Sequence, residues 1–206
     1  MQAIYLVIFL FILFFSVIVH EFCHGYVAYL NGDDTARLLG RLTFNPIPHI
    51  DPVGTVLLPL ILIVASVFTG GRLFIIGWAK PVPINPLNFR DHDRGMLTVG
   101  LAGPASNIIL GTILALLSKN FTAGIVKDVF FFGGIINFVL AFFNLIPIPP
   151  LDGSRILGVF LPGNIRYRYE QLERYGFMLV FAFLFLGGFG LIYPMAYKIA
   201  STLAGS

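Results

Sequence analysis

Long apolar stretches fill most of this chain, and short polar stretches separate them. The apolar stretches cover about residues 2–30, 53–69, 95–117, 125–146 and 175–197. A helix needs about 20 apolar residues to span a bilayer, so four of the five are long enough and the second is marginal. The pattern predicts an α-helical membrane protein, a polytopic bundle of about five transmembrane segments.

Composition supports the same class. The chain has 206 residues, of which 57% are hydrophobic and 11% charged. A soluble domain has about 45–50% apolar and about 25% charged residues. The net charge of +3 is small, and the basic residues lie mostly between the apolar stretches. We therefore expect a lipid bilayer as partner and no nucleic acid, and a single integral-membrane domain over residues 1–206.

The first apolar stretch resembles a signal peptide in length. It lacks a basic amino-terminal region, because the first basic residue is Arg37, and no small-x-small cleavage site precedes His20. We expect this stretch to remain in the mature protein.

The first apolar stretch ends with the motif H-E-x-x-H, residues 20–24. On a helix, positions i and i+4 share one face, so His20 and His24 can both bind one metal ion. Glu21 then lies beside the ion, where it can accept a proton from a metal-activated water. By chance the pattern would occur on the order of 0.001 times in a chain of this composition. The alternative is a pair of buried histidines that only link helices, but ionisable groups inside a membrane usually mark a functional site.

A catalytic zinc ion usually has three protein ligands. Asp152 follows an apolar stretch, in the Pro- and Gly-rich break "NLIPIPPLDGSRI". Such breaks are tolerated at membrane depth where they line a cavity. Asp152 could instead cap the short helix that follows. His49 or Asp51 could also be the third ligand, line an entrance or help to bind a second ion, but we expect them only to cap a turn.

Taken together, these motifs resemble the site-2 protease family of intramembrane zinc metalloproteases. "HEFCH" and "LDG" match its two metal motifs, and "LAGPASN" at 101–107 matches its A-G-P helix. "NPIPHIDPVGT" and "GWAKPVPINPLNFR" resemble a compact prokaryotic branch of the family. The matching motifs cover about residues 16–156.

The resemblance implies a zinc endopeptidase that hydrolyses peptide bonds in or near transmembrane segments of membrane protein substrates. One Zn²⁺ per chain would be held by His20, His24 and Asp152, with Glu21 as general base. The resemblance also suggests Asn144 as the donor that stabilises the oxyanion. Asn144 could equally link helices, and we expect that role for Asn107 and Asn137. An alternative function is a metal transporter or metal-binding protein that uses the same His/Asp site.

The order of the segments places a constraint on the chain between the two motifs. His24 lies near the carboxyl end of the first apolar stretch and Asp152 lies just after the fourth. Three full crossings between them would put them on opposite sides of the membrane. We therefore predict that residues 53–69 enter the membrane and that "GRLFIIGWAKPV", residues 71–82, returns as an extended strand. We predict that this strand pairs with residues 36–44 in a short membrane-embedded sheet, because exposed backbone is excluded from lipid. A free edge of that sheet would bind an unwound substrate.

Charge distribution favours this arrangement. It places nine basic residues on one side of the membrane and four on the other, whereas five full crossings would divide the same residues eight to five. Basic residues favour the cytoplasmic side. We expect the cell membrane of a prokaryote, with the metal site toward the cytoplasm.

Several further residues receive simpler interpretations. We expect Cys23, the single cysteine, to be a small buried side chain, and His92 to be solvated. We expect the pair Gly187–Gly188 to bend the last helix, which could then act as a gate.

Overall fold

The computed structural model describes residues 2–69 and 77–205. Within these residues the chain forms helices, turns and extended segments, and no β-strand. The helices are α1 (Gln2–Leu30), α2 (Thr35–Leu38), η1 (Ile47–His49), the π-helix η2 (Pro52–Leu57), α3 (Leu58–Thr69), η3 (Pro86–Asn88), α4 (His92–Ser118), α5 (Ile125–Asn144), α6 (Asp152–Phe160), α7 (Gly163–Glu170), η4 (Gln171–Tyr175), α8 (Gly176–Phe185) and α9 (Gly188–Ala204).

Three of the described helices are long and apolar enough to cross a bilayer. They are α4, α5 and residues 4–30 of α1. A fourth crossing is available if the helices on both sides of Gly187 form one span, which is bent by 70°. Gly187 lies in the left-handed region, with φ of 93°, which favours glycine. The predicted bend at Gly187–Gly188 is therefore confirmed. The long apolar helices show that the chain is an integral α-helical membrane protein.

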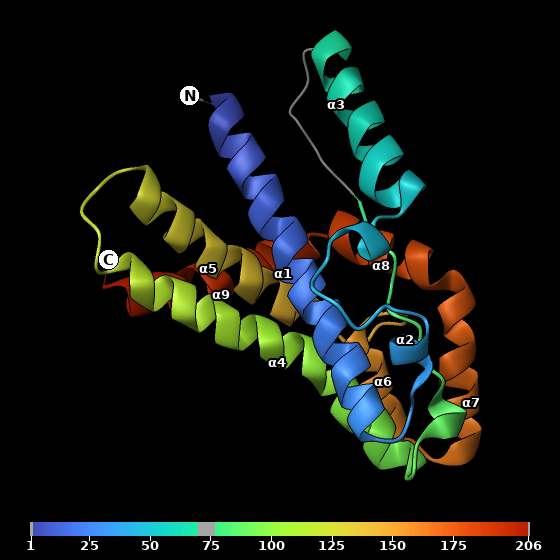
Figure 1. Ribbon diagram of the computed structural model, residues 1–206. Helices are drawn as coiled ribbons and strands as arrows, with labels where there is room; N and C mark the ends of the chain where they lie inside the picture. Colours follow the sequence, from blue (N-terminus) through green and yellow to red (C-terminus); the bar gives the residue numbers. More distant parts are fainter. Residues whose placement is uncertain (1, 70–76, 206) are drawn as a thin grey trace.

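Helix α4 is the centre of the bundle. It packs against α1, α5, α6 and α9 (Figure 1). Gly111 of α4 faces α5, where an added Cβ would lie 3.1 Å from Asn137 Cβ and 3.2 Å from Gly134 O. Small residues allow membrane helices to approach this closely. Farther along these helices, Ala115, Phe138 and Ala196 belong to a buried cluster that joins α4, α5 and α9.

Helix α3 stands apart from this bundle in Figure 1. The chain nevertheless returns to where it left, because Trp78 N–H donates to Gly54 O at 3.2 Å and Thr55 Oγ donates to Trp78 O at 2.8 Å. Two residues later, Lys80 N–H donates to His49 O at 2.9 Å. Gly54 and Trp78 therefore lie side by side, as expected if the chain leaves and re-enters on one side of the membrane. Much of the predicted return strand falls on residues 70–76, which lie outside the described residues.

The strand predicted at residues 36–44 is wrong. The carboxylate of Asp33 accepts from the backbone N–H and the hydroxyl of Thr35, and α2 begins there. Gly40, with φ of 66°, follows the helix, and Arg41 N–H donates back to Ala36 O at 2.8 Å. A glycine in the left-handed region with such a bond is a common helix end. The local turn therefore satisfies backbone groups that a strand would have paired across a sheet.

Candidate metal centre

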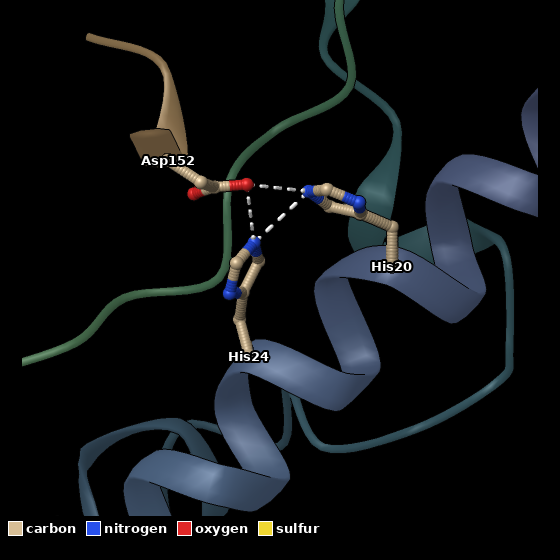
Figure 2. A group of neighbouring side chains, drawn as sticks. All are labelled: His20, His24 and Asp152. Atoms are coloured by element: carbon tan, nitrogen blue, oxygen red, sulfur yellow. Dashed lines mark hydrogen bonds and ion pairs between the residues drawn. The ribbon is translucent and has the colours of Figure 1, made fainter. Parts of the chain in front are cut away.

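Three side chains from distant parts of the chain meet beside α4. His20 and His24 lie one turn apart on α1, and Asp152 is the first residue of α6 (Figure 2). The Nε2 atoms of the two histidines are 2.9 Å apart, and each lies 3.1 Å from Asp152 Oδ2. All three residues are at most 6% exposed. Among the described residues, these three side chains form a group whose ligand atoms are close enough together to hold a metal ion.

Asp152 reaches this position because the chain turns sharply after α5. A Cβ at Gly153 would lie 2.2 Å from Leu145 O, so the backbone of the turn can pass this close only to a glycine. Helix α6 has Leu151 as its N-cap, with no side-chain hydrogen bond. The carboxylate of Asp152 points to the two histidines instead, so the alternative role of Asp152 as a helix cap is wrong.

The other ring nitrogens of both histidines have partners. His24 Nδ1 lies 2.7 Å from Val99 O, and His20 Nδ1 lies 2.6 Å from Asn107 Oδ1. A carbonyl oxygen only accepts, so each Nδ1 carries a proton. In the neutral imidazole each Nε2 then keeps its lone pair. Such outer partners are typical of metal-binding histidines, because they fix the tautomer and the ring orientation.

This arrangement fits zinc. Two histidine nitrogens and a carboxylate oxygen are a known catalytic donor set, with bonds of about 2.0–2.2 Å. Ligands of a tetrahedral ion at that distance are about 3.3 Å apart, close to the separations observed here. With neutral rings, three lone-pair atoms lie within 3.1 Å of one another, an arrangement that a bound cation would stabilise. Gly103 leaves the room for the two rings, because a Cβ there would lie 2.4 Å from His24 Nε2 and 2.5 Å from His20 Nε2.

Glu21 lies beside this group and is oriented differently. Its carboxylate Oε2 accepts a hydrogen bond from Val82 N–H at 2.8 Å. Val82 stands between Pro81 and Pro83, which have no N–H. The backbone of this Pro-Val-Pro sequence therefore has one donor, and that donor binds Glu21.

The segment of residues 77–85 is extended, and polar side chains hold it near the metal group. Arg41 donates to Lys80 O at 2.8 Å and to Pro81 O at 3.2 Å. At the far end, Asn85 N–H donates to Asp33 Oδ2 at 2.7 Å. Burial opposes ionisation of Asp33, but its hydrogen bonds from Thr35, Asn85 and Asn88 outweigh this effect and lower its pKa.

Other candidate residues lie elsewhere. Asn144 donates to Leu140 O of its own helix at 2.9 Å, and it has no described hydrogen bond to the three-residue group. Asp51 caps η2 by accepting from the N–H groups of Val53 and Gly54, so its expected capping role is confirmed.

Three further side chains also lie outside the group. His49 is buried and bonds to Thr43 O, Cys23 is half-buried, and His92 lies on the surface beside Asp93. The expectation that His92 is solvated is confirmed.

Asn107 is the residue of this site whose contact was not anticipated. It does link helices, as predicted, but it also binds a histidine of the metal group. The signal in the sequence is its spacing from Gly103, since positions i and i+4 on α4 face the same way. Gly103 makes room for the rings, and Asn107 holds one of them.

Comparison with known proteins agrees with this site. The sequence model of peptidase family M50 matches residues 52–187. "Putative zinc metalloprotease YwhC" of Bacillus subtilis is 42% identical over 194 residues, which are 87% of this chain and 81% of that protein. "Zinc metalloprotease MJ0392" of Methanocaldococcus jannaschii is 28% identical over 167 residues, 81% of this chain and 38% of that protein. No solved structure matches the chain.

The matched family region includes Asp152, and the alignment with the Bacillus relative covers most of the chain. These relatives are named as zinc metalloproteases, and the donor atoms of His20, His24 and Asp152 suit zinc. The chain belongs to peptidase family M50, the site-2 protease family, and is a zinc metalloendopeptidase.

Proposed function

We propose that this protein is an intramembrane protease that cleaves peptide bonds in or near the transmembrane segments of membrane proteins. His20, His24 and Asp152 would hold the zinc ion, and Glu21 would be the general base. The convergence of three lone-pair atoms within 3.1 Å, from α1 and α6, carries this proposal. Membership of the family supports a membrane-embedded substrate.

The chemistry is divided between the ion and the chain. Bound zinc acidifies a water molecule and polarises the peptide carbonyl. The carboxylate of Glu21 accepts the proton of the attacking water and delivers it to the nitrogen of the leaving amine. The hydrogen bond from Val82 holds one oxygen of that carboxylate, which restricts its rotation and leaves the other oxygen for the proton.

Asn144 remains our proposed donor to the developing oxyanion. Its amide has two hydrogens, and one of them is used by Leu140 O. The second hydrogen is available in principle for a substrate carbonyl.

The extended segment of residues 77–85 is the proposed docking site for an unwound substrate. A helical substrate hides its peptide groups, so it must be extended before hydrolysis. Extended backbone beside Glu21 can bind an extended peptide through main-chain hydrogen bonds. Binding of an unwound substrate, the role predicted for a sheet edge, would then belong to this single segment.

We also propose that the metal site lies toward the cytoplasm of a prokaryotic cell. The close approach of Gly54 and Trp78 supports the arrangement that places nine of the thirteen basic residues on one side. Labelling of single cysteines introduced at Asn120 and at Asn164, in protein whose Cys23 is replaced by alanine, tests this orientation in sealed inverted vesicles. The site faces the cytoplasm if position 164 reacts from outside these vesicles and position 120 does not.

Two substitutions test the catalytic roles. Glu21→Gln should keep one zinc per chain and lower proteolysis by about 10²–10⁴-fold, because the amide cannot accept the proton. Asp152→Ala should lose both zinc and activity. Elemental analysis of the purified protein gives the zinc content. Labelled β-casein in detergent and a labelled single-span protein in phospholipid vesicles give the activity.

Matched controls away from the metal group are Glu173→Gln, at an exposed residue, and Asp128→Ala, at a half-buried residue that accepts a hydrogen bond from Tyr5. Both should keep zinc and activity. Full activity of Glu21→Gln would contradict its role as a base, and full zinc content of Asp152→Ala would contradict its role as a ligand.

A further inference from the structure

A buried chain of polar side chains leads away from His20 into the bundle. Asn107 of α4 and Asn137 of α5 are both 0% exposed, and Ser16 of α1 is 1% exposed. Asn107 Nδ2 donates to Asn137 Oδ1 at 2.9 Å and to Ser16 O at 3.3 Å. Asn137 Nδ2 donates to Ser16 Oγ at 2.9 Å and to Gly133 O at 2.9 Å.

The contacts at the far end of this series of side chains determine which atom of each asparagine amide donates and which accepts. Gly133 O is a backbone carbonyl and can only accept, so it requires the NH₂ group of Asn137 on its side. The oxygen of Asn137 then faces Asn107 and requires the NH₂ group of that residue. Ser16 O, a second backbone carbonyl, requires the same orientation of Asn107.

The orientation of Asn107 determines which proton His20 carries. With its NH₂ group used, Asn107 presents Oδ1 to His20 Nδ1 at 2.6 Å. A neutral imidazole has one donor and one acceptor nitrogen. His20 must therefore donate through Nδ1, and its Nε2 lone pair faces His24 and Asp152.

We propose that Asn107 and Asn137 are positioning residues that lock His20 in the tautomer able to bind the metal. The inference rests on the proposed role of His20 as a zinc ligand. Neither asparagine touches the reacting atoms. Their effect passes from α5 through α4 to α1, so packing of these three helices sets the protonation pattern of the site.

The two histidines solve the same problem in different ways. His24 is fixed directly by Val99 O, a backbone atom that any residue supplies. His20 depends on the side-chain amides of Asn107 and Asn137. Loss of either one would leave a buried polar group of the other without a partner. His20 is therefore the ligand that substitutions in distant helices can disturb.

The test uses ¹⁵N-histidine NMR of the metal-free, full-length protein, at a pH where the imidazoles are neutral. The spectra report which nitrogen of each ring carries the proton. Wild-type His20 should be protonated at Nδ1. Asn107→Leu, which is similar in size but has no acceptor, should give a mixture of tautomers at His20 and leave His24 unchanged.

Zinc affinity provides a second measurement on the same samples. Loss of an outer partner of a metal-binding histidine typically weakens metal binding about 10–100-fold, and we expect this for Asn107→Leu. Asn137→Leu keeps the acceptor but removes one group that orients it, so a smaller loss and a partial mixture are expected. This variant also serves if Asn107→Leu does not fold.

Ser118→Ala is the matched control. Ser118 is fully buried on α4 and bonds only to Ala115 O in its own helix, among the described contacts. Its substitution should change neither the tautomer of His20 nor the zinc affinity. If folded Asn107→Leu and Asn137→Leu both keep His20 protonated at Nδ1, the inference is overturned, whether or not zinc binds. Unchanged zinc binding in His20→Ala would instead overturn the proposed metal site.

Discussion

Two regions adjoin the metal group, and they are held in different ways. On one side, α1, α4 and α5 pack closely around His20 and Asn107, which are 6% and 0% exposed. On the other side, residues 77–85 form an extended segment attached mainly through the polar side chains of Glu21, Arg41 and Asp33. The metal-binding side is fixed by packing, whereas the proposed substrate side is held by hydrogen bonds and by the buried side chain of Val82. Each side can therefore be weakened by substitutions that leave the other intact.

The largest effect is expected from Gly103→Ala, which disturbs the packed side. The new Cβ would lie 2.4–2.5 Å from ring atoms of both histidines. The α4 backbone cannot easily move away, because α4 packs against α5, α6 and α9 as well as α1. We expect zinc affinity to fall at least 10-fold, in the range seen when ligand orientation is lost, and proteolysis to fall with it. Zinc titration and cleavage of labelled casein measure both.

The control for this substitution is Gly158→Ala in α6. A Cβ there meets no atom within 4 Å, and alanine favours a helix over glycine by about 0.5–1 kcal/mol. We expect unchanged zinc binding and slightly higher stability. Tight zinc binding by Gly103→Ala would show that the packed side is softer than we describe.

A smaller effect is expected from Val82→Pro, which removes the hydrogen bond between the two regions. Without the N–H of residue 82, Glu21 loses its partner. A hydrogen bond to a charged group contributes about 1.5–3 kcal/mol, so kcat should fall roughly 10-fold or more while zinc content stays at one per chain. Steady-state kinetics and elemental analysis test this.

Val82→Ala separates the side chain from the backbone. This variant keeps the N–H but loses buried apolar contacts with α1, so it should lose stability and retain most of its kcat. Equal activity of the proline and alanine variants would mean that the bond to Glu21 has no role in catalysis.

The smallest effect is expected at the far anchor of the extended segment, in Asp33→Asn. The pKa of Asp33 is lowered in the folded protein, so its carboxylate stabilises the fold above its ordinary pKa near 3.8. This contribution is lost as the pH falls through the lowered value. Acidification should therefore lower the Tm of the wild type more than that of the variant, as thermal unfolding in detergent would show.

Asp34→Asn is the control for Asp33. Asp34 is exposed and 3.7 Å from Arg37, and such surface pairs contribute about 0–1 kcal/mol. At neutral pH we expect Asp33→Asn to be the less stable of the two variants. If both depend on pH as the wild type does, Asp33 does not anchor the segment as its contacts indicate.

Much of this architecture follows from the sequence because the physical constraints are strong. Apolar stretches of sufficient length predict α1, α4 and α5, and the spacing of His20 and His24 predicts one shared helix face. The pairing of His24 with Asp152, across 128 positions, requires that the intervening chain turn back. The bond between Trp78 and Gly54 satisfies that requirement.

Other features depend on contacts that the local pattern does not encode. Residues 36–44 are compatible with a strand, but Asp33 and Gly40 close a helical turn there. The contacts of Asn107 depend on the rotation of α4 about its axis, and an asparagine among apolar residues does not reveal that rotation. The partner of Glu21 is a backbone N–H, which every residue except proline carries, so no residue type marks it.

The amide chain behind His20 ends on the main-chain oxygens of Gly133 and Ser16, and His24 is held by the main-chain oxygen of Val99. These three oxygens persist whatever side chains occupy the positions. We therefore expect related proteins to keep the contact to His24 whichever apolar residue is buried at position 99, while exchanges at 107 and 137 occur together or not at all. Covariation between Asn107 of α4 and Asn137 of α5 would then reflect their shared effect on which nitrogen of His20, on α1, carries the proton.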